Sequence, residues 1–155
     1  MESRIIALLV TIGNLFVVSA YSQIKPVKFT FTASEISNNK FNIHLLASIE
    51  KPWHIFSIDQ PKKTIIIPTS IKFNKNPLIS LEGKIKEIGN KEFVNEKITN
   101  VSYWQYGEKV DFVQSIQLKA DVITNISGTV SFQVCNERTC LPTKTLPFVI
   151  ELKKG

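Results

Sequence analysis

Sulfur is scarce in this sequence, and its scarcity limits the possible chemistry. The 155 residues include two cysteines, Cys135 and Cys140, and one methionine, which is residue 1. A structural zinc site needs about four protein ligands, and the two histidines, His44 and His54, lie far from the cysteines without paired spacing. A soft copper site usually recruits methionine as well. The composition argues against a metal site, and we expect no cofactor.

Long apolar runs are absent after residue 18. Before it, a positive charge is followed by an apolar run over residues 5–18 and by small residues at Ala20 and Ser22. This pattern is typical of a secretory signal peptide cleaved after Ser22. The alternative is a membrane anchor, but the run is short for a span of about 20 residues. We expect residues 1–22 to be removed and residues 23–155 to form one exported domain. This domain would be periplasmic or secreted, outside the membrane, where disulfides can form.

Basic clusters and helical periodicity are also missing. The formal net charge is +6, but the lysines are scattered along the chain. Neither a basic helix nor the aromatic and glycine signature of a nucleic-acid module is present. We expect a solvated lysine-rich surface and no nucleic-acid partner. No segment after the signal peptide has a sustained period of 3.6 residues, so helices are not expected.

Alternation of apolar and polar residues fills most of the remaining chain. This period of two is typical of strands, and the clearest runs are residues 27–33, 41–49, 110–118, 129–135 and 145–152. Gln114 is an exception, because it occupies an inward position in its run. The spacers, such as "SNNK" and "NKNP", have turn composition. The pattern predicts an all-β fold, an immunoglobulin-like antiparallel β-sandwich of two sheets.

The two cysteines fall at the junction of two predicted strands. Cys135 ends the run 129–135, and Cys140 precedes the run 145–152 with Asn-Glu-Arg-Thr between them. Cross-linking a loop of about six residues contributes only about 2 kcal/mol in the chain-entropy model. Arg138 lies between the thiols and could favour a thiolate. The residues alone leave a structural staple and a reversible redox pair open.

The stretch "VSFQVCNERTCLPTKTLPFVIEL" resembles the periplasmic N-terminal domain of the thiol:disulfide interchange protein DsbD. In that family a strand ends in cysteine, and a short loop leads to a second cysteine and a proline before the last strand. The segments "KPWHIFSIDQPKKTIIIPTSIKF" and "LISLEGKIKEIGNKEFVNE" resemble upstream parts of the same domain. The similarity covers residues 29–152, and its specific part is the block with the two cysteines.

The resemblance implies an immunoglobulin-like fold and a thiol oxidoreductase of the protein-disulfide reductase type. Cys135 and Cys140 would form the redox pair, with Cys140 as the attacking nucleophile and Cys135 as the resolving thiol. In the family a loop with an acidic residue and aromatics caps the pair. The matching stretch here is "NKEFVNE", so Glu92 would lie near the thiols and Phe93 would shield them.

The family passes electrons from a membrane electron-transfer domain and a thioredoxin-like domain to periplasmic disulfide proteins. The resemblance therefore implies thioredoxin-like redox proteins and a membrane electron-transfer protein as partners. This chain contains neither of those domains, so, taken as complete, it is expected to receive electrons from a separate protein.

Three departures from the family pattern are visible. The loop between the cysteines is one residue shorter, Thr143 replaces a second proline, and Val94 occupies the place of a second cap aromatic. The first two would shift the geometry of the loop, and the third would leave the disulfide less well covered. The alternative function is an immunoglobulin-like binding module in which the disulfide is inert.

Overall fold

All regular structure in the described part of the chain is β-strand. The computed structural model describes residues 25–62 and 64–153, and the predicted signal peptide, residues 1–22, lies outside these ranges. Within them, no helix has the length and apolar character needed to cross a membrane. In chain order the strands are β1 (Val27–Ser37), β2 (Lys40–Ile49), β3 (His54–Phe56), β4 (Ser70–Phe73), β5 (Ile79–Gly89), β6 (Glu92–Glu96), β7 (Val101–Tyr106), β8 (Lys109–Leu118), β9 (Thr124–Phe132), β10 (Val134–Cys135) and β11 (Lys144–Leu152).

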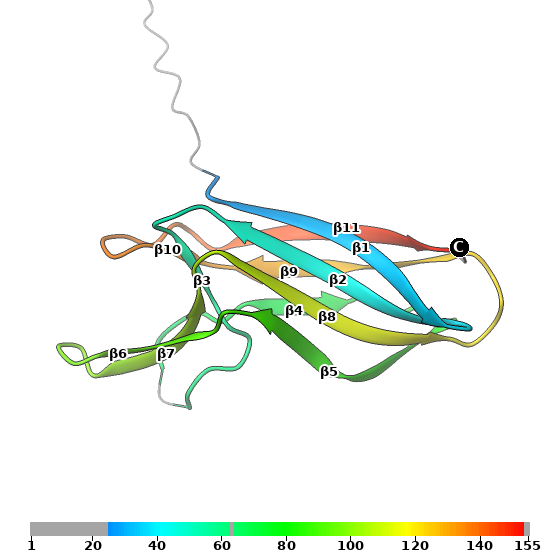
Figure 1. Cartoon of the computed structure of the whole chain (residues 1–155), viewed down its shortest axis with the longest axis horizontal. Coiled ribbons are helices and arrows are strands. Elements are labelled where there is room, and N and C mark those ends of the chain that lie inside the picture. Colours follow the sequence, from blue (N-terminus) through cyan, green and yellow to red (C-terminus); the bar gives the residue numbers. More distant parts are fainter. Residues whose placement is uncertain (1–24, 63, 154–155) are drawn as a thin grey trace, which may run out of the picture.

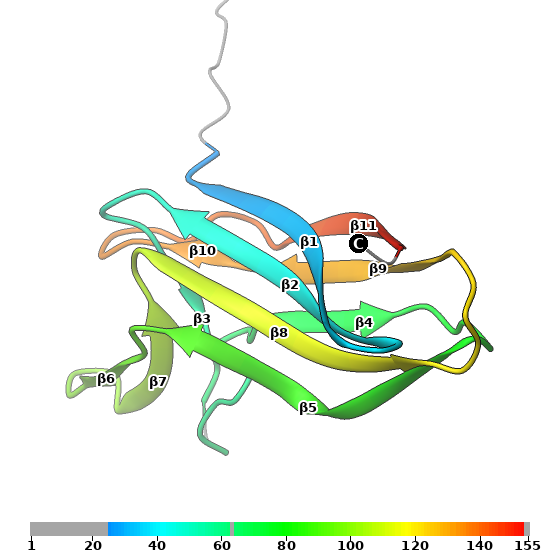
Figure 2. The same cartoon turned by 45° about the vertical axis from the view of Figure 1, so that its right-hand side comes forward.

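Two sheets form the body of a sandwich (Figure 1 and Figure 2). The front sheet has the strand order β1-β2-β8-β5, and the back sheet has the order β11-β9-β4. All strand pairs in both sheets are antiparallel. The rings of Phe31 and Phe148 join the two sheets with their centroids 5.3 Å apart. The antiparallel sandwich expected from the alternating sequence is therefore present.

The core lies between these sheets and is built by the predicted alternation. In β2, for example, Ile43, Leu45 and Ala47 are fully buried, while the residues between them face outward. Phe112 of β8 and Val130 of β9 are also fully buried. All five runs identified in the sequence coincide with strands, although residues 129–135 are divided between β9 and β10. Burial of these side chains is the main stabilising contribution to the body.

The predicted exception, Gln114, is buried and has a structural explanation. Its side-chain amide donates hydrogen bonds to the carbonyl oxygens of Glu82 and Ser115, at 2.9 and 2.8 Å. The pairing of β5 with β8 shifts register between Glu82 and Lys86, and Gly83 in this irregularity has a φ of 68°. Such a bulge leaves a main-chain carbonyl without a ladder partner. Gln114 supplies that partner, which explains a polar residue in an apolar row.

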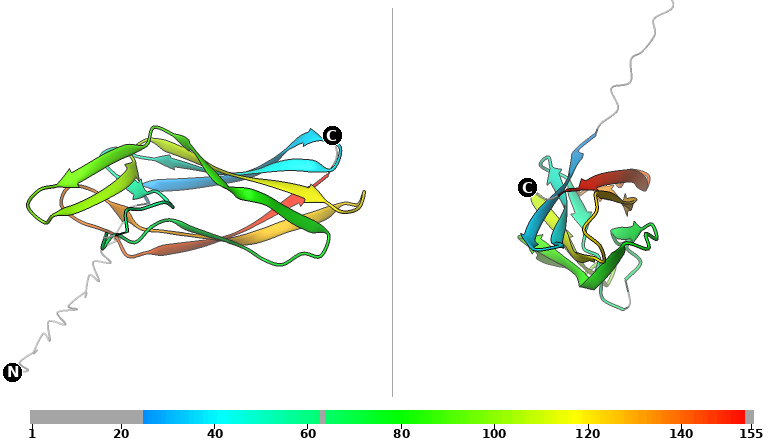
Figure 3. Two further views of the ribbon diagram at one scale, coloured as in Figure 1. Left: turned by 90° about the horizontal axis from the view of Figure 1, so that it is seen from below. Right: turned by 90° about the vertical axis from the view of Figure 1, so that its right-hand side faces the viewer.

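A third sheet, which was not predicted, closes one end of the sandwich. This end sheet has the order β10-β3-β7-β6 and is antiparallel throughout. Its strands follow or precede strands of the body: β3 follows β2, β6 follows β5, β7 precedes β8, and β10 follows β9. Figure 3 shows the β6–β7 hairpin at the end of the molecule away from the C-terminus. The end sheet therefore combines segments from both layers.

The segment "NKEFVNE" forms a strand rather than the cap loop that the family resemblance implies. Residues Glu92–Glu96 form β6, and each of them pairs with a residue of β7, from Gln105 back to Val101. Cross-strand pairing outweighs the weak strand preference of Asn and Glu at an exposed edge. This correction matters because the segment was expected to cap the cysteines.

Candidate functional site: the cysteine hairpin and its neighbours

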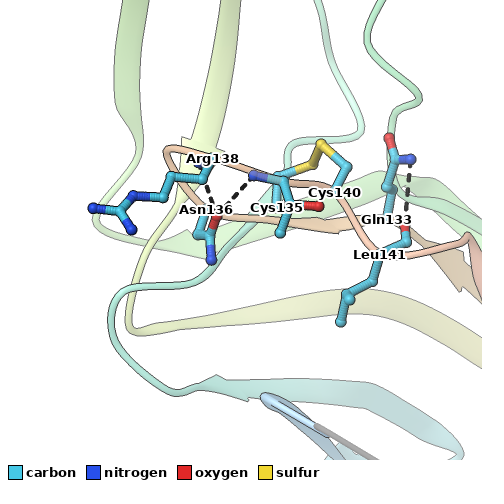
Figure 4. The surroundings of a disulfide bond; sticks show 7 residues. Gln133, Cys135, Asn136, Arg138, Cys140 and Leu141 are labelled. Atoms are coloured by element: carbon cyan, nitrogen blue, oxygen red, sulfur yellow. Dashed lines mark hydrogen bonds between the residues drawn. A yellow bond between two sulfur atoms is a disulfide. The ribbon is translucent and has the colours of Figure 1, made fainter.

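Cys135 and Cys140 form a disulfide across a tight hairpin (Figure 4). Their Cα atoms are 4.0 Å apart, and the two residues face each other as an isolated antiparallel bridge. Main-chain hydrogen bonds flank the bridge on both sides: the Asn136 amide donates to the Thr139 carbonyl at 2.9 Å, and the Leu141 amide donates to the Val134 carbonyl at 2.8 Å. Two main-chain hydrogen bonds therefore hold the cysteines opposite each other in addition to the S–S bond.

Asn136 fixes the turn between the cysteines. Its side-chain oxygen accepts hydrogen bonds from the main-chain amides of Arg138 and Thr139, both at 2.9 Å. This is the Asx-type turn that asparagine commonly forms with amides a few residues later in the chain. Sequence analysis did not single out Asn136. The signal that could have found it is an asparagine at the first position of a short connection between two strands.

The two cysteines differ sharply in exposure. Cys135 is 2% exposed and lies at the end of β10, whereas Cys140 is exposed to solvent. The rate of thiol–disulfide exchange depends on access to the attacked sulfur. A thiol or disulfide of a partner protein can therefore reach Cys140, whereas burial shields Cys135 from a partner.

His54 lies next to Cys135 on the adjacent strand. The ladder pairs Cys135 of β10 directly with His54 of β3, and Cys140 pairs with Cys135 on the other side. Directly opposed residues in antiparallel strands have side chains on the same face, with Cβ atoms about 4.5–5.5 Å apart. Cys140, Cys135 and His54 therefore form a row across three neighbouring segments. The sequence does not reveal that His54 neighbours Cys135, because β3 has only three residues and shows no readable alternation.

Burial lowers the pKa of His54 below its ordinary value of 6.5, and the negative charge of Glu92 acts in the opposite direction. Burial disfavours the protonated imidazole, so the ring is mainly neutral near pH 7. The edge of the ring meets Phe56 with centroids 5.5 Å apart. A neutral, half-buried imidazole beside a cysteine can accept a proton.

A cleft of about 380 Å³ opens beside His54. Trp53 and Gln105 contribute to its lining, and the charged residues around it are Lys51, Glu92, Glu108 and Lys109. Cys135, in the middle of the row, is therefore buried. Cys140 is exposed to solvent at one end of the row, and His54 faces the cleft, which opens to solvent, at the other end.

The structure brings Glu92 toward the row but keeps two strands between it and Cys135. Glu92 belongs to β6, and its carboxylate accepts a hydrogen bond from the side chain of Gln105 at 3.3 Å. The register pairs Glu92 with Gln105 and Gln105 with Phe56. Phe56 is two residues from His54, so these side chains share the face that carries Cys135. Glu92 acts on the site electrostatically, through His54.

The structure does not bring Phe93 to the sulfurs, in contrast to the expected shielding role. Phe93 pairs with Trp104, which is on the opposite face of the end sheet from Glu92 and Cys135. Its ring packs on Trp104 with centroids 4.7 Å apart, and the residue is 52% exposed. The reason for the difference is that the segment is a pleated strand, so that neighbouring residues point to opposite sides.

Arg138 is exposed, and its guanidinium points away from the sulfurs (Figure 4). Its ordered contact in the turn is made by the main-chain amide, which binds Asn136. In the described residues, 25–62 and 64–153, no three side chains of histidine, cysteine, aspartate or glutamate gather as a metal site would require. The chemical groups that the fold places together here are the two sulfurs and an imidazole.

Comparison with solved structures identifies proteins of similar fold, whereas comparison with known sequences finds no relative. No family model matches the sequence, and no curated protein sequence matches it significantly. Among solved structures, the N-terminal periplasmic domain of ScsB from Proteus mirabilis aligns with a TM-score of 0.56 and 13% identity, over 84% of this chain and 47% of that one. The N-terminal domain of DsbD from Neisseria meningitidis, in the reduced form, aligns with a TM-score of 0.49 and 12% identity, over 81% of this chain and 86% of that one.

The chain thus spans about half the length of the ScsB structure that it matches. At such low identity the likeness concerns the fold alone. The predicted fold class is confirmed: the described residues form an all-β, immunoglobulin-like antiparallel sandwich, and the fold aligns with that of the N-terminal periplasmic domain of ScsB.

Proposed function

We propose that this protein is a thiol:disulfide interchange domain of the DsbD N-terminal type, with Cys135 and Cys140 as its redox pair. The observation that carries the proposal is the unequal exposure of two bonded cysteines in a hairpin that its own hydrogen bonds hold together. A sulfur that partners can reach, backed by a second sulfur that they cannot, suits an exchange reaction with one attacking and one resolving thiol.

The catalytic cycle begins with the reduced pair. The thiolate of Cys140 attacks a disulfide of the partner, one partner sulfur leaves as a thiolate, and a mixed disulfide forms between Cys140 and the other. Cys135 then loses its proton and attacks the sulfur of Cys140. The bond between Cys140 and the partner breaks, its electron pair goes to the partner sulfur, and that sulfur takes up a proton. The partner has gained two electrons, and the protein is left with the Cys135–Cys140 disulfide.

The hairpin allows this cycle to run without unfolding. The flanking hydrogen bonds at Asn136 and Leu141 do not involve the sulfur atoms, so we expect them to keep the two segments in register when the S–S bond is reduced. A bond that closes such a short loop contributes at most about 2 kcal/mol of stability. The disulfide can therefore open and close at little cost to the fold, which favours exchange over a structural role.

The partners follow from the sequence resemblance. We propose that a thioredoxin-like protein or a membrane electron-transfer protein reduces the pair, and that the pair then reduces exported disulfide proteins. The periplasm is the corresponding location, with residues 1–22 as the signal peptide and residues 23–155 as one domain. Glu92 and Arg138 are the charged candidates for tuning the thiols: Glu92 acts through His54, and Arg138 would act through a long-range charge effect, because its guanidinium points away from the sulfurs (Figure 4).

The test is to trap the mixed disulfide with oxidised glutathione as the probe. Reduced Cys135→Ala should accumulate a glutathione adduct on Cys140, because no resolving thiol remains. Reduced Cys140→Ala should form little adduct, because Cys135 is buried. Intact-mass measurement separates the two cases. Equal trapping in both variants, or in neither, would overturn the assignment and favour a binding module with an inert disulfide.

A further inference from the structure

The resolving step poses a problem of proton transfer at a buried atom. Cys135 is 2% exposed, so bulk water has little access to its thiol proton, yet the thiolate is the nucleophile in disulfide exchange. A side chain inside the fold must therefore take the proton or hold the thiolate. This inference rests on the proposed function and concerns which residue performs that step.

We propose that His54 is the proton acceptor for Cys135 and that the cleft beside His54 is the route by which the proton reaches solvent. The pairing of Cys135 with His54 puts both side chains on one face of the end sheet, on adjacent strands. His54 in turn lines the cleft of about 380 Å³. His54 therefore lies between the buried cysteine and the cleft, which opens to solvent.

The other charged and titratable groups around His54 fit this role less well. Glu92 of β6 is two strands from Cys135 and is engaged by Gln105. Burial raises the pKa of Tyr103 of β7, which keeps its hydroxyl protonated. Lys51, Glu108 and Lys109 line the cleft, and Lys51 pairs with Glu108 at 2.7 Å. Among the residues described by the structure, His54 is the base that stands directly opposite Cys135.

The protonation state and the packing of His54 also suit the step. Burial lowers its pKa below 6.5, so the ring is neutral and able to accept a proton at pH 7. The charge of Glu92 raises that pKa in part and stabilises the imidazolium once it forms. The edge contact with Phe56 restricts the orientation of the ring.

The resolving step then consists of a proton transfer and a disulfide exchange. The imidazole takes the proton from the sulfur of Cys135, and the resulting thiolate attacks the sulfur of Cys140 in the mixed disulfide. The bond from Cys140 to the partner breaks, and its electron pair goes to the partner sulfur. The imidazolium returns the proton to this leaving thiolate or releases it to water in the cleft. No oxidant other than the mixed disulfide is needed.

The first experiment isolates Cys135 by the substitution Cys140→Ser. Its alkylation by iodoacetamide is followed from pH 5 to pH 9 with His54 present and with His54→Gln. We expect His54→Gln to slow alkylation at pH 7 by at least about tenfold, a threshold set below the ~10²–10⁴-fold that general bases typically contribute, and to have little effect at pH 9. His44→Gln is the matched control, because His44 lies on the front sheet and contacts Ser34 and Asp111. Far-ultraviolet circular dichroism verifies the fold of each variant.

The second experiment distinguishes proton transfer from packing. In Cys140→Ser/His54→Ala, added free imidazole should restore part of the alkylation rate at pH 7, because the cleft leads to the vacated side-chain position. Identical pH profiles with and without His54, or no reaction of Cys135 at any pH, would overturn the inference. A tenfold loss without any rescue by imidazole would also overturn it, since the role of His54 would then be structural.

The outcome is separable from that of the glutathione test. Alkylation of Cys135 requires no partner, so it reports on His54 even when no mixed disulfide can be trapped. Trapping on Cys140 together with unchanged alkylation would remove His54 from the mechanism and leave the exchange function intact.

Discussion

The body of the sandwich and its end sheet are built from different strands and are stabilised in different ways. In the body, long strands bury alternate apolar side chains, such as Phe41, Ile43 and Phe112, between two layers. In the end sheet the strands are two to six residues long. There, Ile55, Tyr106 and Val134 extend the buried core, and side-chain hydrogen bonds and partly exposed aromatics provide much of the remaining contact.

Glu87 illustrates this second mode. Its carboxylate accepts hydrogen bonds from the Ser57 hydroxyl and the Ile58 amide, both at 2.7 Å, and from the Lys91 ammonium at 3.0 Å. Gln60 exchanges two hydrogen bonds with the main chain of Trp104. These polar contacts hold the segment after β3 against the end of β5 and against β7. The body therefore provides most of the stability. The end sheet positions the polar groups of the site without any change in the packing of the body.

The largest effect is expected in the body. Phe112 is fully buried in the core, so Phe112→Ala should lower the free energy of unfolding by about 3–5 kcal/mol through lost burial and the remaining cavity. Denaturant unfolding monitored by tryptophan fluorescence measures this loss. A loss below about 1 kcal/mol would mean that the core collapses around the site and that the body is less tightly packed than described.

A smaller loss is expected when the polar network of the end is broken. The Glu87 side chain is 8% exposed, and Glu87→Ala removes the acceptor for three donors. Hydrogen bonds to charged groups contribute about 1.5–3 kcal/mol, and the loss of stability should fall in this range. Glu82→Ala is the control, since Glu82 lies on the same strand with an exposed ion pair to Lys40. Equal effects of the two substitutions would contradict a structural role for the buried carboxylate.

Reduction of the disulfide should lower the free energy of unfolding by less than Phe112→Ala does. Because hydrogen bonds at Asn136 and Leu141 already hold the hairpin, the reduced protein should be less stable by at most about 2 kcal/mol, the short-loop limit. Unfolding curves with and without a phosphine reductant give the difference. Global unfolding at room temperature on reduction would favour a structural staple over an exchange pair.

The smallest effect on stability is expected at Phe93. Its ring is half exposed and rests on Trp104, so Phe93→Ala should cost only about 1 kcal/mol of stability. Because Phe93 and Cys135 lie on opposite faces of the end sheet, the rate of disulfide reduction by dithiothreitol should not change. A clear acceleration would restore the shielding role that the sequence resemblance implies for Phe93.

The division between body and end also explains what could be predicted. The long runs of alternating residues identify β1, β2, β8, β9 and β11, because one face of each is buried and the period of two is visible over many residues. The short strands β3, β6 and β10 lack this signal. The family resemblance implies a cap loop for the segment containing β6, and the five residues Glu92–Glu96 alternate too little to indicate a strand instead. Its pairing with β7 depends on contacts distant in sequence, which local propensity does not contain.

The sequence predicts the two cysteines of the site but not the residues that surround them. The positions of Cys135 and Cys140 at a strand junction are readable from the sequence. The neighbour His54 is not, because it depends on the register between β3 and β10, two segments separated by about half of the chain. The face of Phe93 likewise depends on whether its segment is pleated, and a loop reading carries no information about faces.

The reduction potential of the Cys135–Cys140 bond decides whether the two cysteines are an exchangeable redox pair. The protein is equilibrated with mixtures of reduced and oxidised dithiothreitol or glutathione, and the oxidised fraction is determined by thiol alkylation and mass measurement. The account predicts a potential between about −180 and −270 mV, in the range of thioredoxin-like partners. A potential below about −300 mV, typical of structural disulfides, would contradict it.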